Sequence, residues 1–173
     1  NLEELADYFN VETSYFESEY EIVNRYLQLN DINKQKLLKV ANELYFSQLY
    51  KYRVHAKLSA GLGNYYDENY EFDTVYFKSE YDYDIASWVD GDSMEPKYHN
   101  GDVALIKKTG FDYDGLIYAV VYNEETYIKK AYIEEDKVRL VSLNDKYDDI
   151  IAPIDEVRIV GLVTKSFRPI SEV

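Results

Sequence analysis

The sequence contains no cysteine, only two histidines and no apolar run long enough to cross a membrane. Without cysteine, the chain cannot form disulfides, thiol nucleophiles or cysteine-ligated zinc and iron–sulfur sites. His55 and His99 are too few for a three-histidine metal site within one chain, although carboxylate-based sites stay open. A signal peptide's charged-then-apolar pattern is also absent. We therefore expect a cytoplasmic protein without membrane contact.

Positively charged residues are scarce in this chain. Its 173 residues include 19 Lys and Arg against 33 Asp and Glu, which gives a formal net charge of −14. A negative field of this size repels phosphate backbones, so this stretch by itself is expected to bind nucleic acid poorly. The length allows one full domain with a smaller appendage, or one large domain.

The first fifty residues show the spacing of amphipathic helices. Asn10 is placed to end the first helix, and Thr13 to cap a short second one. Asn30 or Asp31 can cap a long helix that runs to about Tyr50. The apolar residues that recur at spacings of three and four are Leu2, Leu5 and Phe9, and then Leu37, Val40, Ala41 and Leu44.

From Tyr52 onward, β-branched and aromatic residues occur in short runs separated by Gly, Asn and Asp, which is typical of a β domain. Asn123-Glu124 and Glu135-Asp136 each separate two such runs and indicate tight hairpin turns. The predicted fold class is α+β, a short helical N-terminal segment followed by a mostly β domain. The expected strands are 52–57, 74–77, 85–89, 103–107, 116–122, 125–132, 137–142 and 157–164.

Three sequence elements in order carry the chemical signal. The run VDGDSMEP (residues 89–96) places Ser93 in a turn after a strand, and GDVALI (residues 101–106) opens the next strand. Lys129 lies 36 residues after Ser93 in the run YIKK, and the pair Ala60-Gly61 ends 32 residues before Ser93. Together these elements resemble the LexA and phage-repressor family of self-cleaving serine peptidases. The resemblance implies that Ser93 is the nucleophile, Lys129 the base and Ala60-Gly61 the scissile bond.

The chemistry accounts for these residue types. A serine hydroxyl is a weak nucleophile until a base accepts its proton, and a lysine can serve only when burial keeps it neutral. Met94, Tyr127 and Ala131 could form part of an apolar wall around Lys129. Backbone amides of the Ser93 turn would stabilise the oxyanion. Adjacent strand residues face opposite ways, and the resemblance implies that the first lysine of the pair is catalytic, which leaves Lys130 as a solvent-facing charge.

Other interpretations of these segments stay open. Ser93 could be a turn serine that bonds its own backbone, and residues 59–64 could be only a linker. His55 and His99 are expected to be structural or exposed. Acidic side chains crowd the Ser93 turn, yet serines of this family act without metal, so neither a metal nor another cofactor is expected. The acidic residues concerned are Asp90, Asp92 and Glu95.

The N-terminal residues carry a second resemblance. Residues 1–18 resemble the last helices of a Cro/phage-repressor helix-turn-helix domain, and the earlier helices, including the DNA-reading one, have no counterpart here. The chain therefore looks truncated, and operator DNA would bind through the missing part. An ordinary helical cap on the β domain is the alternative. The expected organisation is residues 1–18 as this remnant, 19–51 as a helical connector and 52–173 as a LexA-like domain, with the cleavage segment near 59–64.

The resemblances imply a transcriptional repressor whose C-terminal domain forms a homodimer and cuts its own chain. Cutting removes the tether between the paired DNA-binding domains. It thereby removes most of the additional affinity for DNA that the tether provides. In the family, cleavage is commonly stimulated by the RecA filament after DNA damage; an antirepressor protein is a second candidate partner. The alternatives are a non-cleaving dimerisation or effector-binding module, and a signal-peptidase-like enzyme, which would need a membrane anchor.

Overall fold

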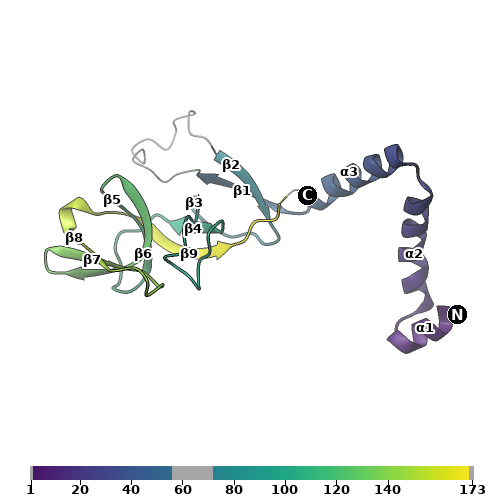
Figure 1. Cartoon of the computed structure of the whole chain (residues 1–173), viewed down its shortest axis with the longest axis horizontal. Coiled ribbons are helices and arrows are strands. Elements are labelled where there is room, and N and C mark those ends of the chain that lie inside the picture. Colours follow the sequence, from purple (N-terminus) through teal and green to yellow (C-terminus); the bar gives the residue numbers. More distant parts are fainter. Residues whose placement is uncertain (1, 56–71, 172–173) are drawn as a thin grey trace. The chain divides into compact units, whose positions relative to one another are not determined.

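The computed structural model describes residues 2–55 and 72–171, with the backbone alone for residues 2 and 15–20. It divides into two compact units, Asn1–Gln48 and Leu49–Val173. Figure 1 shows helices in the first unit and strands in the second. The α+β fold class is therefore confirmed.

The helical unit consists of α1 (Leu2–Phe9), α2 (Thr13–Gln28) and α3 (Asp31–Ser47). Asn10 follows α1 in the left-handed region, at φ 52°, which asparagine tolerates and which ends the helix. Thr13 is the first residue of α2 rather than its cap, because Glu12 holds the cap position. The Asn30 side chain accepts a 2.9 Å hydrogen bond from the Asn33 amide, so Asn30 caps α3. No helix within the described ranges is long and apolar enough to cross a membrane.

The described strands of the second unit form one nine-stranded sheet in the order β2-β1-β3-β4-β9-β5-β6-β7-β8. Only the β1–β3 pair is parallel among the described strand pairs. Figure 1 shows that the chain returns from β8 to place β9 among the earlier strands. The strands are β1 (Tyr50–His55), β2 (Phe72–Phe77), β3 (Ile85–Trp88), β4 (Val103–Lys107), β5 (Ile117–Tyr122), β6 (Glu125–Glu134), β7 (Lys137–Val141), β8 (Ile150–Pro153) and β9 (Arg158–Phe167).

The eight expected strands are present: the strand at 103–107 has the expected bounds, and the others have shifted ends. Residues 56 and 57 of the expected strand 52–57 lie outside the described residues. Both hairpin turns are also present, and Asn123 and Glu124 have positive φ values of 50° and 62°, as a two-residue turn between twisted strands requires. The short strand β8 was not expected. It has four residues, ends in proline and pairs only with β7 at the edge of the sheet, so neither alternation nor length indicated it.

The last long strand, β9, lies inside the sheet. It pairs with β4 on one side and β5 on the other, and Val163 is buried within the unit. Ile159, Val160 and Leu162 of the same strand are partly buried and pack against the core clusters.

Two core clusters support the region that holds Ser93 and Lys129. The first contains Met94, the residue after Ser93, together with Ile85 and Ile106 of the strands on either side of the turn. The second contains Ala131 of β6 and Leu140 of β7. Burial of these apolar side chains stabilises the strand ends from which the turn and the lysine project.

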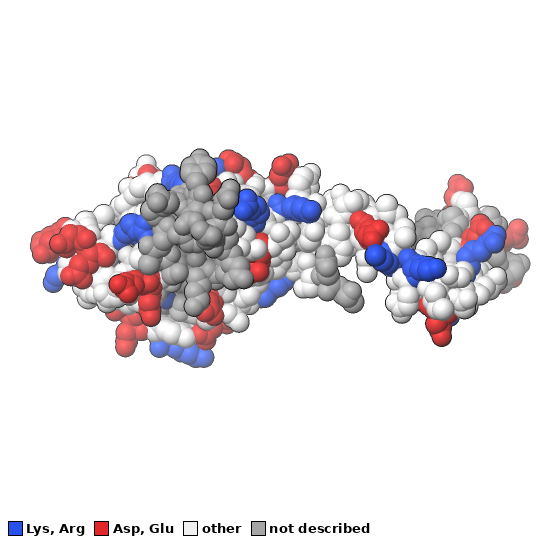
Figure 2. Space-filling view, turned by 90° about the horizontal axis from the view of Figure 1, so that it is seen from above, with Lys and Arg blue, Asp and Glu red and all other residues white. Residues whose placement is uncertain are grey.

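Acidic side chains gather in several clusters on the face of the β unit shown in Figure 2, between scattered lysines and arginines. This distribution agrees with the strongly negative composition of the chain.

Candidate active site

Ser93 lies in a turn between β3 and β4 that is closed at its base and anchored in the core. The Val89 amide donates to the Asp102 carbonyl and the Gly101 amide donates to the Val89 carbonyl, each at 2.8 Å. Gly91 has φ +81°, a conformation that favours glycine, which allows the chain to bend just before the serine. Met94 is only 3% exposed and fixes the turn from the other side. Ser93 is therefore held in place by both of its neighbouring segments.

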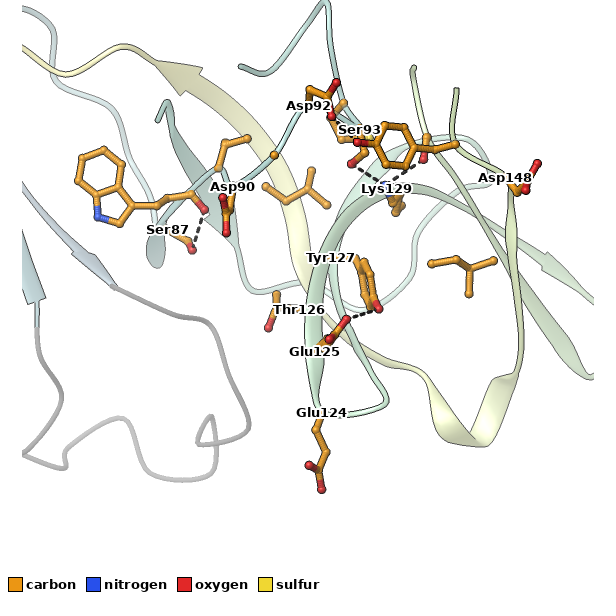
Figure 3. Close-up of a pocket in the computed structure, with 18 residues that line it drawn as sticks. Ser87, Asp90, Asp92, Ser93, Glu124, Glu125, Thr126, Tyr127, Lys129 and Asp148 are labelled. Carbon is orange, nitrogen blue, oxygen red and sulfur yellow. Dashed lines mark hydrogen bonds between the residues drawn. The ribbon is translucent and has the colours of Figure 1, made fainter. Parts of the chain in front are cut away.

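Lys129 reaches Ser93 from β6. Its Nζ lies 2.6 Å from the Ser93 Oγ, and the side chain is 5% exposed. The serine and the lysine of the sequence pattern therefore lie within hydrogen-bond distance of each other, as Figure 3 shows. Lys130 is the next residue of the same strand, and its side chain points to the opposite face.

Burial lowers the pKa of Lys129 from its usual value of 10.5. The cause is the loss of hydration, which disfavours the ammonium form more than the neutral amine. A neutral amine 2.6 Å from a hydroxyl can accept its proton. The arrangement can therefore activate a serine without a histidine.

Ser142 is a second partner of Lys129 that the sequence reasoning missed. Its Oγ lies 2.9 Å from the lysine Nζ, directly after β7. The hairpin turn at Glu135-Asp136 could have revealed it. In that hairpin Lys130 pairs with Val141, so the next pair outward is Lys129 with Ser142.

A pocket of about 780 Å³ opens beside this pair. Its lining comes from the Ser93 turn, from residues 124–129 and from the segment after β7 (Figure 3). Met94 and Tyr127 line it, as expected for an apolar wall, whereas Ala131 packs into the core cluster with Leu140 and is not part of the lining. The Tyr127 hydroxyl donates to Glu125, a bond that raises the pKa of Tyr127 to about 12.

Ala60 and Gly61, the expected scissile pair, lie outside the described residues. The strands that flank them are described, and His55 at the end of β1 pairs with Phe72 at the start of β2. His55 also pairs with Ser87 of β3, and Ser87 lines the pocket. The described residues on either side of this segment are therefore paired with each other, and one of them, His55, is paired with a residue of the pocket lining.

Neither histidine lines the pocket that contains Ser93 and Lys129. The His55 ring packs against Phe72 with ring centroids 4.5 Å apart, and burial lowers its pKa. His99 is half-exposed and its Nδ1 lies 3.3 Å from Glu95. In the part of the chain that the structure describes, no group of three or more histidines, aspartates and glutamates is placed to hold a metal ion.

Comparison with known proteins gives consistent matches. A family model described as Peptidase S24-like matches residues 48–164. LexA repressor of Thermosipho melanesiensis is 31% identical over 120 residues, which cover 66% of this chain and 60% of that protein. LexA repressor of Geotalea uraniireducens is 37% identical over 83 residues, 46% of this chain and 41% of that protein. The alignments with the Thermosipho melanesiensis and Thermosipho africanus repressors each span about 60% of the relative's length.

Proposed function

This chain belongs to the peptidase S24-like family, and we propose from this premise that it is part of a LexA-type repressor that cuts its own backbone between Ala60 and Gly61. The observation that carries the proposal is the buried Lys129 amine, 2.6 Å from the Ser93 hydroxyl. In this proposal residues 52–173 form the peptidase and dimerisation domain, residues 19–51 the connector and residues 1–18 the end of a helix-turn-helix domain.

The proposed reaction starts with neutral Lys129, which takes the proton of Ser93 as the serine Oγ attacks the carbonyl carbon of Ala60. Backbone amides of the Ser93 turn stabilise the resulting oxyanion. The Lys129 ammonium returns the proton to the nitrogen of Gly61 as the peptide bond breaks. Water then hydrolyses the ester on Ser93, with Lys129 again as the base.

Attack within one chain is supported by the path of the flanking strands. His55 is the last residue of β1 and pairs with Ser87 at the pocket. Ala60 follows five residues later, a stretch that spans at most about 17 Å when extended. A bond tethered this close to the nucleophile has a high effective concentration, so an intramolecular reaction is favoured over attack on a second chain.

Cleavage would switch off repression through the loss of a tether. The proposed homodimer holds two DNA-binding domains on paired half-sites, and each domain alone binds operator DNA more weakly. An activated RecA filament and an antirepressor protein are the proposed inducing partners. The net charge of −14 supports placing the DNA-reading surface elsewhere than on these residues.

Self-cleavage is tested by incubating the purified chain at mildly alkaline pH and measuring the fragments by mass spectrometry. We expect two products, residues 1–60 and 61–173, that appear with a first-order rate independent of protein concentration. A rate that rises in proportion to concentration would contradict attack within one chain. An intact chain after long incubation at high pH, and with an activated RecA filament, would favour a non-cleaving dimerisation or effector-binding module.

Dimerisation of the β domain is a separate prediction. Exposed apolar side chains on this unit, such as Ile151 at 60% and Ile154 at 41%, support it. We expect sedimentation of the intact chain to show a dimer at micromolar concentration. A strict monomer across this range would refute the prediction, because the proposed switch depends on a paired C-terminal domain.

A further inference from the structure

The segment from Ser142 to Tyr147, which follows β7, contacts both members of the Ser93–Lys129 pair. Ser142 holds the lysine amine at 2.9 Å. The backbone amides of Leu143 and Asn144 both donate to the Ser93 carbonyl, each at 3.1 Å. One short stretch of chain therefore touches the nucleophile and the base, which come from different parts of the sheet.

The same segment also binds Asp92, the residue before the nucleophile. The Asn144 side-chain amide donates to the Asp92 carbonyl oxygen at 3.1 Å, and the Tyr147 hydroxyl donates to the Asp92 carboxylate. The Tyr147 ring extends toward Lys129, with its centroid 5.6 Å from the lysine Nζ. Tyr147 thus contacts the turn with its hydroxyl and approaches the base with its ring.

We propose that Tyr147 is a positioning residue for the Ser93–Lys129 pair. Its hydroxyl fixes the Ser93 turn through Asp92, and its ring covers the Lys129 amine. The inference rests on the proposed self-cleavage for its kinetic consequences, whereas its effect on Lys129 can be measured without any cleavage.

The hydroxyl acts through geometry. A hydrogen bond to a carboxylate is stronger than one between neutral groups, and here it joins two segments 55 residues apart in the sequence. The bond also raises the pKa of the Tyr147 hydroxyl, so the hydroxyl stays protonated at the mildly alkaline pH of a cleavage assay. Its loss would leave the Ser93 turn with fewer restraints.

The ring has two opposite effects on Lys129. Its π-face attracts the ammonium, which favours the charged form, and its bulk excludes water, which favours the neutral form. We expect the exclusion of water to outweigh the attraction, because Lys129 is only 5% exposed and the ring centroid is 5.6 Å from its Nζ, near the outer limit for a cation–π contact. The other titratable groups that line the pocket around the lysine, all acidic or phenolic, are Asp90, Asp92, Glu124, Glu125, Tyr127 and Asp148.

The test compares Tyr147→Phe, which keeps the ring, with Tyr147→Ala, which removes it. Tyr113→Ala is the matched control, because Tyr113 is a 73% exposed tyrosine of the same unit outside the pocket lining. Two quantities are measured, the pH profile of the cleavage rate and the pKa of Lys129 by lysine-selective ¹³C NMR. The NMR titration uses a Ser93→Ala background that does not cut, and Lys129→Met assigns the signal.

We expect Tyr147→Phe to slow cleavage about tenfold with the midpoint of the pH profile unchanged, since only the hydrogen bond is lost. Tyr147→Ala should slow neutral-pH cleavage further and raise the pKa of Lys129 by about one unit, because water then hydrates the ammonium. Tyr113→Ala should match the wild type. An unchanged or lowered pKa of Lys129 in Tyr147→Ala overturns the proposal, as does a wild-type cleavage rate in Tyr147→Phe.

The two measurements separate this inference from the proposed function. If the wild-type chain never cuts, self-cleavage is refuted, and the NMR titration still decides whether Tyr147 covers Lys129. If the wild type cuts and both Tyr147 variants match Tyr113→Ala, the positioning role is refuted and self-cleavage stands.

Discussion

Ser93→Ala is expected to abolish self-cleavage, with a rate at least about 10⁴-fold below that of the wild type, because the variant loses the oxygen that attacks the peptide carbonyl in the proposed reaction. Lys129→Met should have an effect of the same size, because methionine keeps most of the side-chain volume and removes the base. The Nζ–Oγ distance of 2.6 Å is the reason that the two residues should act as one unit. The double variant should therefore be no slower than either single one.

Lys130→Ala is the matched control for this prediction. Lys130 is the neighbour of Lys129 on β6 and has the same charge, but it faces the other side of the strand. The Lys130→Ala variant should cut itself at close to the wild-type rate, as followed by mass spectrometry over the same time course. If Lys130→Ala stopped cleavage while Lys129→Met did not, the assignment of the base would be wrong. If both single dyad variants cut normally, the dyad itself would be refuted.

The cleavage rate is expected to rise with pH, about tenfold per unit, until the pKa of Lys129 is passed, and then to level off. Only the neutral amine can accept the serine proton, and the fraction of Lys129 in the neutral form grows about tenfold per pH unit below the pKa. Burial lowers this pKa from 10.5, so the plateau should begin below pH 10.5. The measurement is the first-order rate constant of fragment formation across a series of buffers from neutral to alkaline pH.

The same shift in pKa predicts how stability depends on pH. The folded state holds its Lys129 proton less tightly than the unfolded chain does, so between the two pKa values the unfolded state binds more protons. The lysine therefore destabilises the fold at neutral pH, and this cost is lost as pH rises through the folded pKa toward 10.5. Lys129→Met should raise the free energy of unfolding at pH 7 and flatten its pH dependence.

For the pH profile of cleavage, a rate that falls as pH rises would contradict the general-base role of Lys129.

Local sequence patterns were sufficient for the element types. The change from a spacing of three and four to short β-branched runs near Tyr52 predicted the helical and β parts, and β1 begins at Tyr50. Such patterns succeed because they reflect burial of one face of a helix or strand. The strand β8 was not predicted because four residues ending in proline show too little periodicity. Its pairing with β7 also depends on the connection between the two strands.

The sequence by itself determined the family, through the Ser93 turn, the lysine 36 residues later and the GD pair that opens β4. Alternation along a strand allows only one of Lys129 and Lys130 to face the serine, and the resemblance to the family selected Lys129. Residues 60 and 61 lie outside the described residues, so the scissile pair stays a prediction. These inferences needed only spacing, local chemistry and the resemblance to a known family.

Only the tertiary structure decided what surrounds the pair. Ser142 and Tyr147 meet Lys129 and Asp92 across 13 and 55 residues of chain, through the pairing of β6 with β7 and the path of the segment that follows. It also buried Val163 within the sheet, because β9 returns between β4 and β5. The sequence chemistry required a buried Lys129, but the burial that lowers its pKa and the position of the Tyr147 ring beside it arise from packing of the whole sheet.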